Sequence, residues 1–335
     1  MKEARYYTKL EEGKVGCQLC PHACVLEDWA TGLCHARTNH GGQLFSDNYG
    51  QVTALHSDPI EKKPLYHFFP GREILSVGSW GCNLDCGWCQ NCEIAHPQAQ
   101  GYAALPVTPP RELVDRARKP GNLGLAFTYN EPMVWHEYMM DTATLAAEAG
   151  LKNVVVTNGY VNSKPLAELL QVTHAFNTDL KGFTPEFYRR RTGGKLQPVK
   201  NTLLAIARKG LHQEITCLVI PGLNDEPEVF NQMAQWIAGE LGRHTVLHIS
   251  RYYPARDRHA PPTPVAVMER LWYIACEHLD HVYPGNVKLH PGSANTDCPK
   301  CGYLVAERNG YQVSLRHADT AGRCSHCGTQ VFVLS

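Results

Sequence analysis

The arrangement of the cysteines constrains this chain more than any other feature of its sequence. Eleven of the fourteen cysteines lie in three short groups: Cys17, Cys20, Cys24 and Cys34; Cys82, Cys86 and Cys89; and Cys298, Cys301, Cys324 and Cys327. The opening residues, MKEARYYTKLEEGK, contain no apolar stretch typical of a secretory signal, so we expect a cytoplasmic protein. In a reducing compartment, clustered cysteines are more often metal ligands than disulfides. The spacing therefore predicts three metal-binding groups.

The charge balance and the hydropathy pattern exclude two classes of protein. Lys and Arg together number 32, as do Asp and Glu, so the formal net charge is zero. Proteins that coat nucleic acid need clustered positive charge, so we expect no nucleic-acid partner. No apolar run approaches the roughly 20 residues that span a bilayer, so we expect no membrane partner either.

The cysteine groups divide the chain into four parts. We expect a metal-binding module at 1–45, a polar connector at 46–73, an alternating strand and helix region at 74–290 and a second small module at 295–335. Short apolar runs rich in β-branched residues predict strands at 74–79, 123–129, 152–158, 175–180, 214–220 and 245–252. Helical patterns occur at 110–118, 134–149, 163–170, 199–209, 228–241 and 265–278.

Strands that alternate with helices predict an α/β fold with a parallel sheet. Six such units are too few for a complete eight-stranded barrel. In α/β folds of both the open and the closed kind, the active site lies at the carboxyl ends of the strands. We therefore expect functional residues directly after the predicted strands.

The central cysteine group directly follows the first of these strands, in a loop that also contains Gly78, Gly81 and Gly87. Three thiolates can hold three irons of a [4Fe–4S] cluster and leave the fourth iron open, whereas an electron-carrying cluster normally has four cysteine ligands. An open iron can chelate the amino and carboxylate groups of S-adenosylmethionine (SAM). The spacing therefore predicts SAM-dependent radical chemistry.

The spacing CxxxCxxC, with Trp88 directly before the third cysteine, resembles the radical SAM signature. The segments LAFTYNEP, VVTNG, NTDLKG, LVIPGLND and HISRYYP resemble segments of the pyruvate formate-lyase activating enzymes. The overall likeness is greatest to the radical SAM member of the AmmeMemoRadiSam system, because the chain also carries the CxLCPHxC start, the DPIEKKPL connector and the terminal CPxCG pairs.

This resemblance implies a partial (βα)6 radical SAM barrel and a set of SAM-binding residues. It implies that Glu131 lies near the SAM amino group and that Asn158, Asp179 and Lys181 line the SAM site. Trp88 and His248 are also predicted to bind the cofactor, and His248 lies on the last predicted strand, near the expected entrance for the substrate. Each residue also has a structural interpretation: Glu131 can compensate a helix N-terminus and Asn158 can form a turn. Asp179 and Lys181 can form an ion pair, and His248 can be a hydrogen-bonded residue of a strand.

The resemblance also implies the reaction and the partners. We expect reductive cleavage of SAM to a 5′-deoxyadenosyl radical, which abstracts hydrogen from a substrate that the sequence does not identify. Activating enzymes act on a partner protein, and the AmmeMemoRadiSam likeness implies Memo-like and Amme-type partners. The electron would come from a flavodoxin-like or ferredoxin-like donor.

Cys92 supports an alternative function. It extends the central group to four thiols, Cys82, Cys86, Cys89 and Cys92, which could close the cluster and make an iron–sulfur electron-transfer protein. A second alternative is a zinc-ribbon binding protein without catalysis. Cys92 as a buried thiol near the cluster is the simpler interpretation.

The terminal groups differ in their spacing. Two CxxCG pairs with a hairpin between them predict a structural zinc site in the C-terminal module, with a rubredoxin-like iron site as the alternative. The spacing of the N-terminal group fits zinc and an auxiliary [4Fe–4S] cluster equally, and His22 could replace one ligand. Cys217 and Cys276 lie in apolar stretches and are predicted to be buried thiols.

Overall fold

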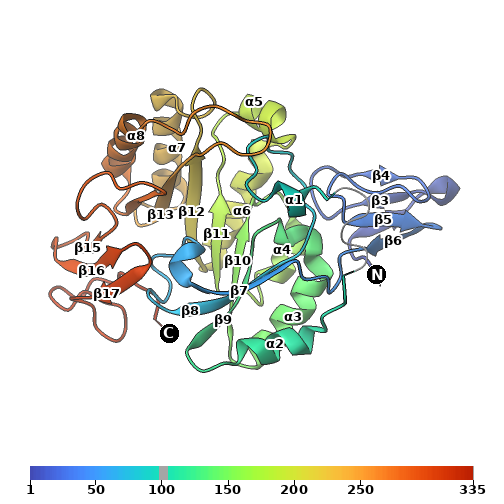
Figure 1. Cartoon of the computed structure of the whole chain (residues 1–335), viewed down its shortest axis with the longest axis horizontal. Helices are drawn as coiled ribbons and strands as arrows, with labels where there is room; N and C mark the ends of the chain where they lie inside the picture. The colour runs from blue at the N-terminus through green and yellow to red at the C-terminus, as the bar shows by residue number, and fades with distance from the viewer. Residues whose placement is uncertain (98–104, 335) are drawn as a thin grey trace.

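A curved eight-stranded sheet forms the centre of the protein. The computed structural model describes residues 1–97 and 105–334, and the sheet has the order β14-β13-β12-β11-β10-β9-β8-β7 (Figure 1). All neighbouring pairs are parallel except the antiparallel edge pair β7 and β8. The strands are β7 (Ala54–Pro59), β8 (Glu73–Gly78), β9 (Asn122–Phe127), β10 (Lys152–Thr157), β11 (Ala175–Asp179), β12 (His212–Val219), β13 (Val246–Arg251) and β14 (Val282–Gly285).

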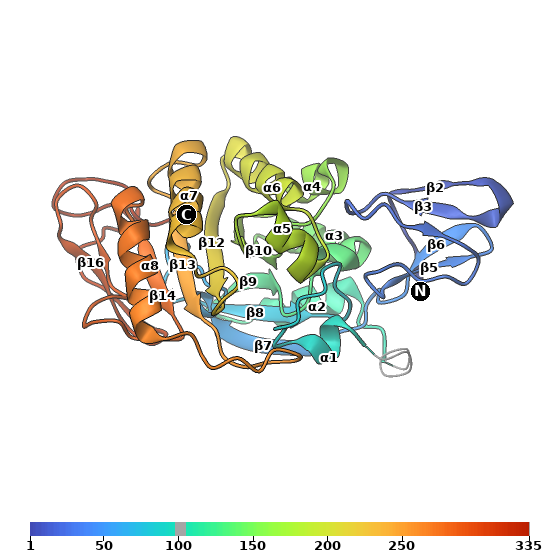
Figure 2. The ribbon, with the colours of Figure 1, turned by 90° about the horizontal axis from the view of Figure 1, so that it is seen from above.

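Helices follow the parallel strands and pack on the outer side of the sheet, as Figure 2 shows for α6, α7 and α8. The predicted α/β fold with a parallel sheet is confirmed. The main helices are α2 (Pro110–Ala117), α3 (His136–Glu148), α4 (Ser163–Leu169), α6 (Leu196–Lys209), α7 (Pro227–Glu240) and α8 (Val265–His278). Shorter ones are η2 (Ile60–Lys62), α1 (Cys92–Ala95), η3 (Pro132–Trp135), α5 (Pro185–Phe187) and η4 (Tyr188–Thr192).

Strand alternation explains why the strands read as continuous apolar runs. Leu125 and Phe127 of β9 pack with the helices on the outer face, whereas Ala126 between them packs on the inner face. On the inner face, Ala126 meets Phe68 and Phe69 of the connector. Both faces of the sheet are therefore covered, as a parallel sheet requires.

Two strands of the sheet, β7 and β14, were not predicted from the sequence. β7 lies within the predicted polar connector. Because it is a partly solvated strand at the edge of the sheet, it contains the exposed polar residues His56 and Ser57. β14 has four residues, including Pro284 and Gly285, which are uncommon inside strands. The sheet thus has seven parallel strands where six were predicted, and an antiparallel strand at one edge.

The connector fills the concave face of the sheet. The backbone amides of Tyr66 and His67 donate to the two carboxylate oxygens of Glu214 at 2.9 and 2.7 Å. Glu214 is fully buried near the beginning of β12. This carboxylate therefore holds the connector across the interior, at the end opposite the carboxyl ends of the strands.

Small sheets at the two ends of the chain lie on opposite sides of the central sheet (Figure 1). The N-terminal strands are β1 (Lys2–Glu3), β2 (Tyr7–Lys9), β3 (Val15–Cys17), β4 (Val25–Leu26), β5 (Arg37–His40) and β6 (Gln43–Ser46), with η1 (Glu11–Gly13) between β2 and β3. They pair as β1-β6-β5 and β2-β3-β4. The C-terminal sheet contains β15 (Thr296–Asp297), β16 (Leu304–Asn309) and β17 (Gln312–Leu315); Ser335, the last residue of the predicted C-terminal module, lies outside the described residues.

Buried polar contacts attach both modules to the barrel. Arg37 and Glu137, each 1% exposed, form a two-fold ion pair with nitrogen–oxygen distances of 2.5 and 2.6 Å. At the other end, the Val333 amide donates to the His67 carbonyl at 2.8 Å, and the Phe69 amide donates to the Val333 carbonyl at 2.9 Å. None of the helices in the described residues is long and apolar enough to cross a bilayer.

Candidate active site at the end of the parallel strands

The loop that follows β8 carries the central cysteines, and glycine shapes its start. A Cβ atom on Gly78 would lie 2.9 Å from the Thr128 carbonyl oxygen. Gly81 has a φ of +95°, and a Cβ there would lie 2.7 Å from the Cys34 carbonyl oxygen. Only glycine permits both close approaches, so the loop packs tightly between the next strand and the N-terminal module.

Cys82, Cys86 and Cys89 line one open cavity with Trp88 at this end of the sheet. The cavity is also lined by Leu84, Gln90, Asn91, Tyr129, Asn130, Glu131, Asn158, Lys181 and Leu218. Cys92 does not line the cavity; it begins α1. The loop thus presents three thiols to the cavity, and the fourth lies outside its lining.

The thiols have the chemistry of metal ligands. Burial raises the pKa of the Cys86 thiol to about 11, so an isolated thiolate there is unfavourable at neutral pH. A metal compensates the charge and deprotonates a coordinating thiol. The three sulfur atoms do not converge within 4.8 Å, so they are not arranged around a single ion. The donor set and its spread fit a cluster that binds each cysteine through a different iron.

Glu131 contributes a buried carboxylate to the cavity. It precedes η3, and its Oε1 accepts hydrogen bonds from the Met133 amide at 2.9 Å and from Thr157 Oγ1 at 2.7 Å. Its Oε2 accepts from the Asn158 amide at 2.7 Å. Burial raises the pKa of Glu131 to about 7, although these hydrogen bonds oppose the rise. The carboxylate therefore caps η3 and also lines the cavity.

Asn158 connects the second loop to the cysteine loop. Its side-chain amide donates to Asn83 Oδ1 at 2.9 Å and lies 3.8 Å from Cys82 Sγ. Its Oδ1 accepts from the Tyr160 amide at 2.8 Å, which forms the predicted turn. Asn158 therefore both forms the predicted turn and lines the cavity.

Lys181 reaches the cavity, and Asp179 supports it from outside the lining. The Lys181 ammonium donates to Asp179 Oδ2 at 2.7 Å. Although burial opposes the charged ammonium, Asp179 and Cys86 raise the Lys181 pKa above its ordinary value. The predicted pair is present, and its cation faces the cysteines.

His248 lies elsewhere. Its Nε2 contacts Glu214 Oε2 at 2.6 Å, its ring packs edge-on against Tyr66, and it does not line the cavity. It is three residues before the end of β13, so it belongs to the polar contacts that hold the connector. The structure therefore does not bring His248 to the predicted SAM site.

Sequence reasoning missed two residues of the site. Asn83 follows Cys82 without any pattern of its own, yet its carbonyl accepts from His22 and its side chain joins Asn158. Tyr129 lines the cavity with a φ of +78°, an unusual value for a residue with a side chain. Its hydroxyl donates to Asp58 Oδ2 at 3.0 Å, which links the cavity to the connector.

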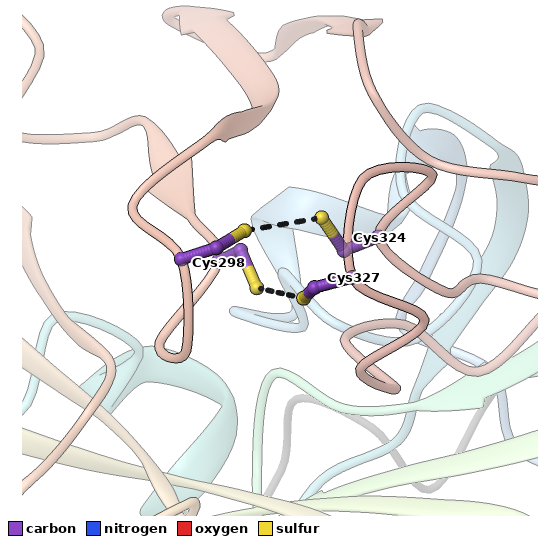
Figure 3. A group of neighbouring side chains, drawn as sticks. Cys298, Cys324 and Cys327 are labelled. Atoms are coloured by element: carbon purple, nitrogen blue, oxygen red, sulfur yellow. Dashed lines mark hydrogen bonds between the residues drawn. The ribbon is translucent and has the colours of Figure 1, made fainter.

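The C-terminal thiols converge on a single point (Figure 3). The Sγ atoms of Cys298 and Cys327 are 3.5 Å apart, those of Cys301 and Cys324 are 3.6 Å apart, and all four lie within 4.8 Å of one another. Four thiolates at 2.3 Å from one tetrahedral ion are about 3.8 Å apart. This group therefore has the dimensions of a site for one metal ion.

The N-terminal thiols also share a cavity. Cys17, Cys20, Cys24 and Cys34 line it together with Arg37 and several apolar residues. Unlike the C-terminal thiols, they are not a group whose sulfur atoms all lie within 4.8 Å. His22 also lines this cavity, but its Nε2 lies 2.7 Å from the Asn83 carbonyl oxygen.

Comparison with known proteins relates the barrel to one superfamily. The model of the radical SAM superfamily matches residues 78–234. The chain is 38% identical to the uncharacterized protein MJ0808 of Methanocaldococcus jannaschii over 337 residues, which cover 100% of both chains. It is 25% identical over 199 residues to the pyruvate formate-lyase-activating enzyme of Clostridium pasteurianum, covering 54% of this chain and 81% of that protein.

Two solved structures share the fold. The radical SAM methyltransferase from Sphaerobacter thermophilus has a TM-score of 0.53 and 15% identity, over 71% of each chain. Streptococcus suis SuiB bound to S-adenosylmethionine has a TM-score of 0.50 and 13% identity, over 64% of this chain and 52% of that one. At this level of identity the similarity concerns the architecture alone.

Proposed function

Since the model of the radical SAM superfamily matches residues 78–234, we propose that this chain is a radical SAM protein in which Cys82, Cys86 and Cys89 hold a [4Fe–4S] cluster with one iron open to SAM. The observation that carries this proposal is that these three thiols line one cavity together with Glu131, Asn158 and Lys181. When bound and reduced, the cluster supplies the electron that cleaves SAM into methionine and a 5′-deoxyadenosyl radical. The radical abstracts hydrogen from the substrate.

The chain's own residues bind and orient SAM in this proposal. Glu131 offers a carboxylate that Thr157 and Asn158 hold in place, and it pairs with the SAM ammonium group. Lys181 offers a cation beside the thiolates, and Asp179 positions it. Trp88 packs on Phe187, with 5.7 Å between ring centroids, and so supports the loop between Cys86 and Cys89.

We assign the substrate to the class of proteins, as for an activating enzyme. The similarity to the pyruvate formate-lyase-activating enzyme supports this assignment. The sequence likeness to the AmmeMemoRadiSam system adds Memo-like and Amme-type proteins as partners and a flavodoxin-like or ferredoxin-like protein as electron donor. We also assign zinc to the C-terminal thiols, because their separation fits one tetrahedral ion and closes the site to other ligands.

Spectroscopy on the purified protein tests the SAM site directly. The chain is prepared without oxygen, loaded with iron and sulfide, and reduced with dithionite, and its electron paramagnetic resonance (EPR) spectrum is recorded with and without SAM. An open iron predicts a changed signal upon SAM addition in wild type and in Cys92→Ala. Loss of the cluster in Cys92→Ala, with no response to SAM in wild type, would support the electron-transfer function instead.

A further inference from the structure

The N-terminal cysteines differ in spread from the C-terminal ones. Both groups have four thiols, and all eight residues are described. The C-terminal sulfur atoms all lie within 4.8 Å of one another, whereas no three of the N-terminal sulfur atoms form such a group. The N-terminal thiols nevertheless line one cavity. In this respect they resemble the central group, which also shares a cavity without converging on one point.

This spread favours one of the two kinds of metal site that the spacing allowed. Thiolates that bind one zinc ion are held about 3.8 Å apart by its short bonds. Thiolates that bind separate irons of a cluster are held farther apart, because the cluster lies between them. The N-terminal arrangement fits the second case.

The lining of the N-terminal cavity is suited to a cluster. Gly32 lies directly beside two of the thiols, because a Cβ atom there would be 3.8 Å from Cys34 Sγ and 3.9 Å from Cys24 Sγ. Since glycine has no side chain, the space beside these sulfur atoms stays open. Leu19, Leu26 and Val134 cover other parts of the cavity. An apolar and enclosed environment of this kind stabilises a cluster against solvent.

Arg37 provides an unused hydrogen-bond donor in the same place. Its side chain is 1% exposed and lines the cavity, and its two terminal nitrogens bind Glu137 and the Arg5 carbonyl. Its Nε is buried without a hydrogen-bond partner among the described residues. A buried donor of this kind is costly when unpaired, and sulfur atoms of a bound cluster accept such hydrogen bonds.

The N-terminal cavity lies against the catalytic loop on both sides of Cys82. The Cys34 carbonyl is the atom that a Cβ on Gly81 would meet at 2.7 Å. On the other side, His22 also lines the N-terminal cavity, and its Nε2 lies 2.7 Å from the Asn83 carbonyl oxygen. Cys20 also packs in the same buried cluster of side chains as Leu84 and Cys86.

Asn83 and Asn158 complete a continuous path between the two groups. Asn83 is bonded covalently to Cys82, and its Oδ1 accepts from the Asn158 amide that lies 3.8 Å from Cys82 Sγ. The path from the N-terminal cavity to Cys82 therefore runs through His22 and Asn83.

We infer that Cys17, Cys20, Cys24 and Cys34 hold a second iron–sulfur cluster that passes electrons to the catalytic one through the contact of His22 with Asn83. One electron leaves the reduced N-terminal cluster, which becomes oxidised, and enters the oxidised catalytic cluster, which becomes reduced. A one-electron protein donor of the flavodoxin or ferredoxin class then reduces the N-terminal cluster again. The electron-transfer step rests on the proposed function, whereas the presence of the second cluster does not.

Metal analysis of the full chain tests the second cluster. After anaerobic reconstitution we expect about eight irons per wild-type chain, as two [4Fe–4S] clusters require, and one zinc from the C-terminal group. The variant Cys82→Ser/Cys86→Ser/Cys89→Ser should keep about four irons with an EPR signal that SAM does not change. The variant Cys20→Ser/Cys24→Ser should lose the other half while its remaining signal still responds to SAM. Cys276→Ser, which is outside all three groups, is the matched control.

The outcomes separate the two proposals. Two zinc ions and no iron in the central triple variant would overturn the second cluster and leave the catalytic one intact. The opposite result would overturn the proposed function. In that case Cys20→Ser/Cys24→Ser would contain no iron, whereas the central triple variant would keep its iron. Retained zinc at the C-terminal group shows in each case that the chain is folded, because that group also docks on the connector.

Turnover with two reductants tests the direction of electron flow. Dithionite is small and reaches the open catalytic cavity directly, so Cys20→Ser/Cys24→Ser should still form 5′-deoxyadenosine with it. With a reduced flavodoxin as donor, the same variant should be at least about tenfold slower than Cys276→Ser, a loss typical of a removed supporting contact at a metal site. Equal rates with flavodoxin in both variants would contradict the proposed route.

Discussion

The carboxylate of Glu131 and the backbone amide of Asn158 are 2.7 Å apart, and this contact joins the ends of two neighbouring parallel units beside the cysteine loop. It fixes one carboxylate oxygen at the cavity independently of any ligand. Thr157 holds the other oxygen at 2.7 Å, so the group has little freedom to rotate. A rigid carboxylate in this position is prepared to receive an ammonium group.

Replacing this carboxylate tests its role in SAM binding. Glu131→Gln keeps the shape but removes the negative charge, so we expect the affinity for SAM to fall at least about tenfold. Isothermal titration of the reconstituted chain measures the change. Glu137→Gln is unsuitable as a control because Glu137 pairs with Arg37, whereas the exposed Glu93→Gln is a suitable one. An unchanged affinity in Glu131→Gln would reassign Glu131 to capping η3 alone.

The same carboxylate predicts a pH dependence of SAM binding. Burial raises the pKa of Glu131 to about 7, so the carboxylate is largely protonated and neutral at pH 6 and charged at pH 8. Since the charged form pairs with the ammonium group, SAM affinity should rise as the pH increases through 7. Titrations at pH 6, 7 and 8 check this expectation, and the slope should disappear in Glu131→Gln.

The contacts of His248 predict a structural role. Glu214 accepts hydrogen bonds from His248, His212 and two connector amides, so His248→Gln should lower the free energy of unfolding by about 1–3 kcal/mol. SAM affinity should change less than twofold, because His248 does not line the cavity. Thermal unfolding and SAM titration are measured on the same preparation. A large loss of SAM affinity without loss of stability would restore His248 to the SAM site.

His136 predicts sensitivity to mild acid. Burial lowers the pKa of His136 to about 4, and neither ring nitrogen has a hydrogen-bond partner among the described residues. The unfolded chain binds a proton near pH 6.5, but the folded chain does so only near pH 4. Stability is therefore lost as the pH falls through this window, by up to about 1.4 kcal/mol per pH unit.

Removing the imidazole should reduce this loss. His136→Leu should show a smaller decrease in melting temperature between pH 7 and pH 5 than wild type. His56→Leu, at an exposed position of β7, is the matched control. A parallel decrease in all three proteins would show that His136 does not determine the acid response.

The sequence predicts the central strands of the sheet well, because a buried strand requires apolar residues that are visible in the sequence. Strands covered on both faces, such as β9 and β10, read as continuous apolar runs. β7 escapes because one of its edges is free and its residues are partly polar. β14 escapes because it is short and contains Pro284.

The candidate site is predictable where a motif and a strand end coincide. The central cysteines and Glu131 follow predicted strands, Asn158 ends one, and the structure places them around one cavity. His248 is different, since alternation shows which face of the sheet it occupies but not its depth along the barrel axis. Glu214, the residue that binds it, looks like one polar residue in an apolar strand. Asn83 was missed because its importance comes from its contact with His22 of the N-terminal module, which is distant in sequence.

The formation of 5′-deoxyadenosine tests the central claim most directly. The anaerobically reconstituted chain is mixed with dithionite and SAM, and the product is quantified by mass spectrometry in wild type, Cys86→Ala and Cys276→Ala. The account predicts product in wild type and in Cys276→Ala, and none above background in Cys86→Ala. A wild-type chain with a complete, reducible cluster that forms no 5′-deoxyadenosine would contradict it.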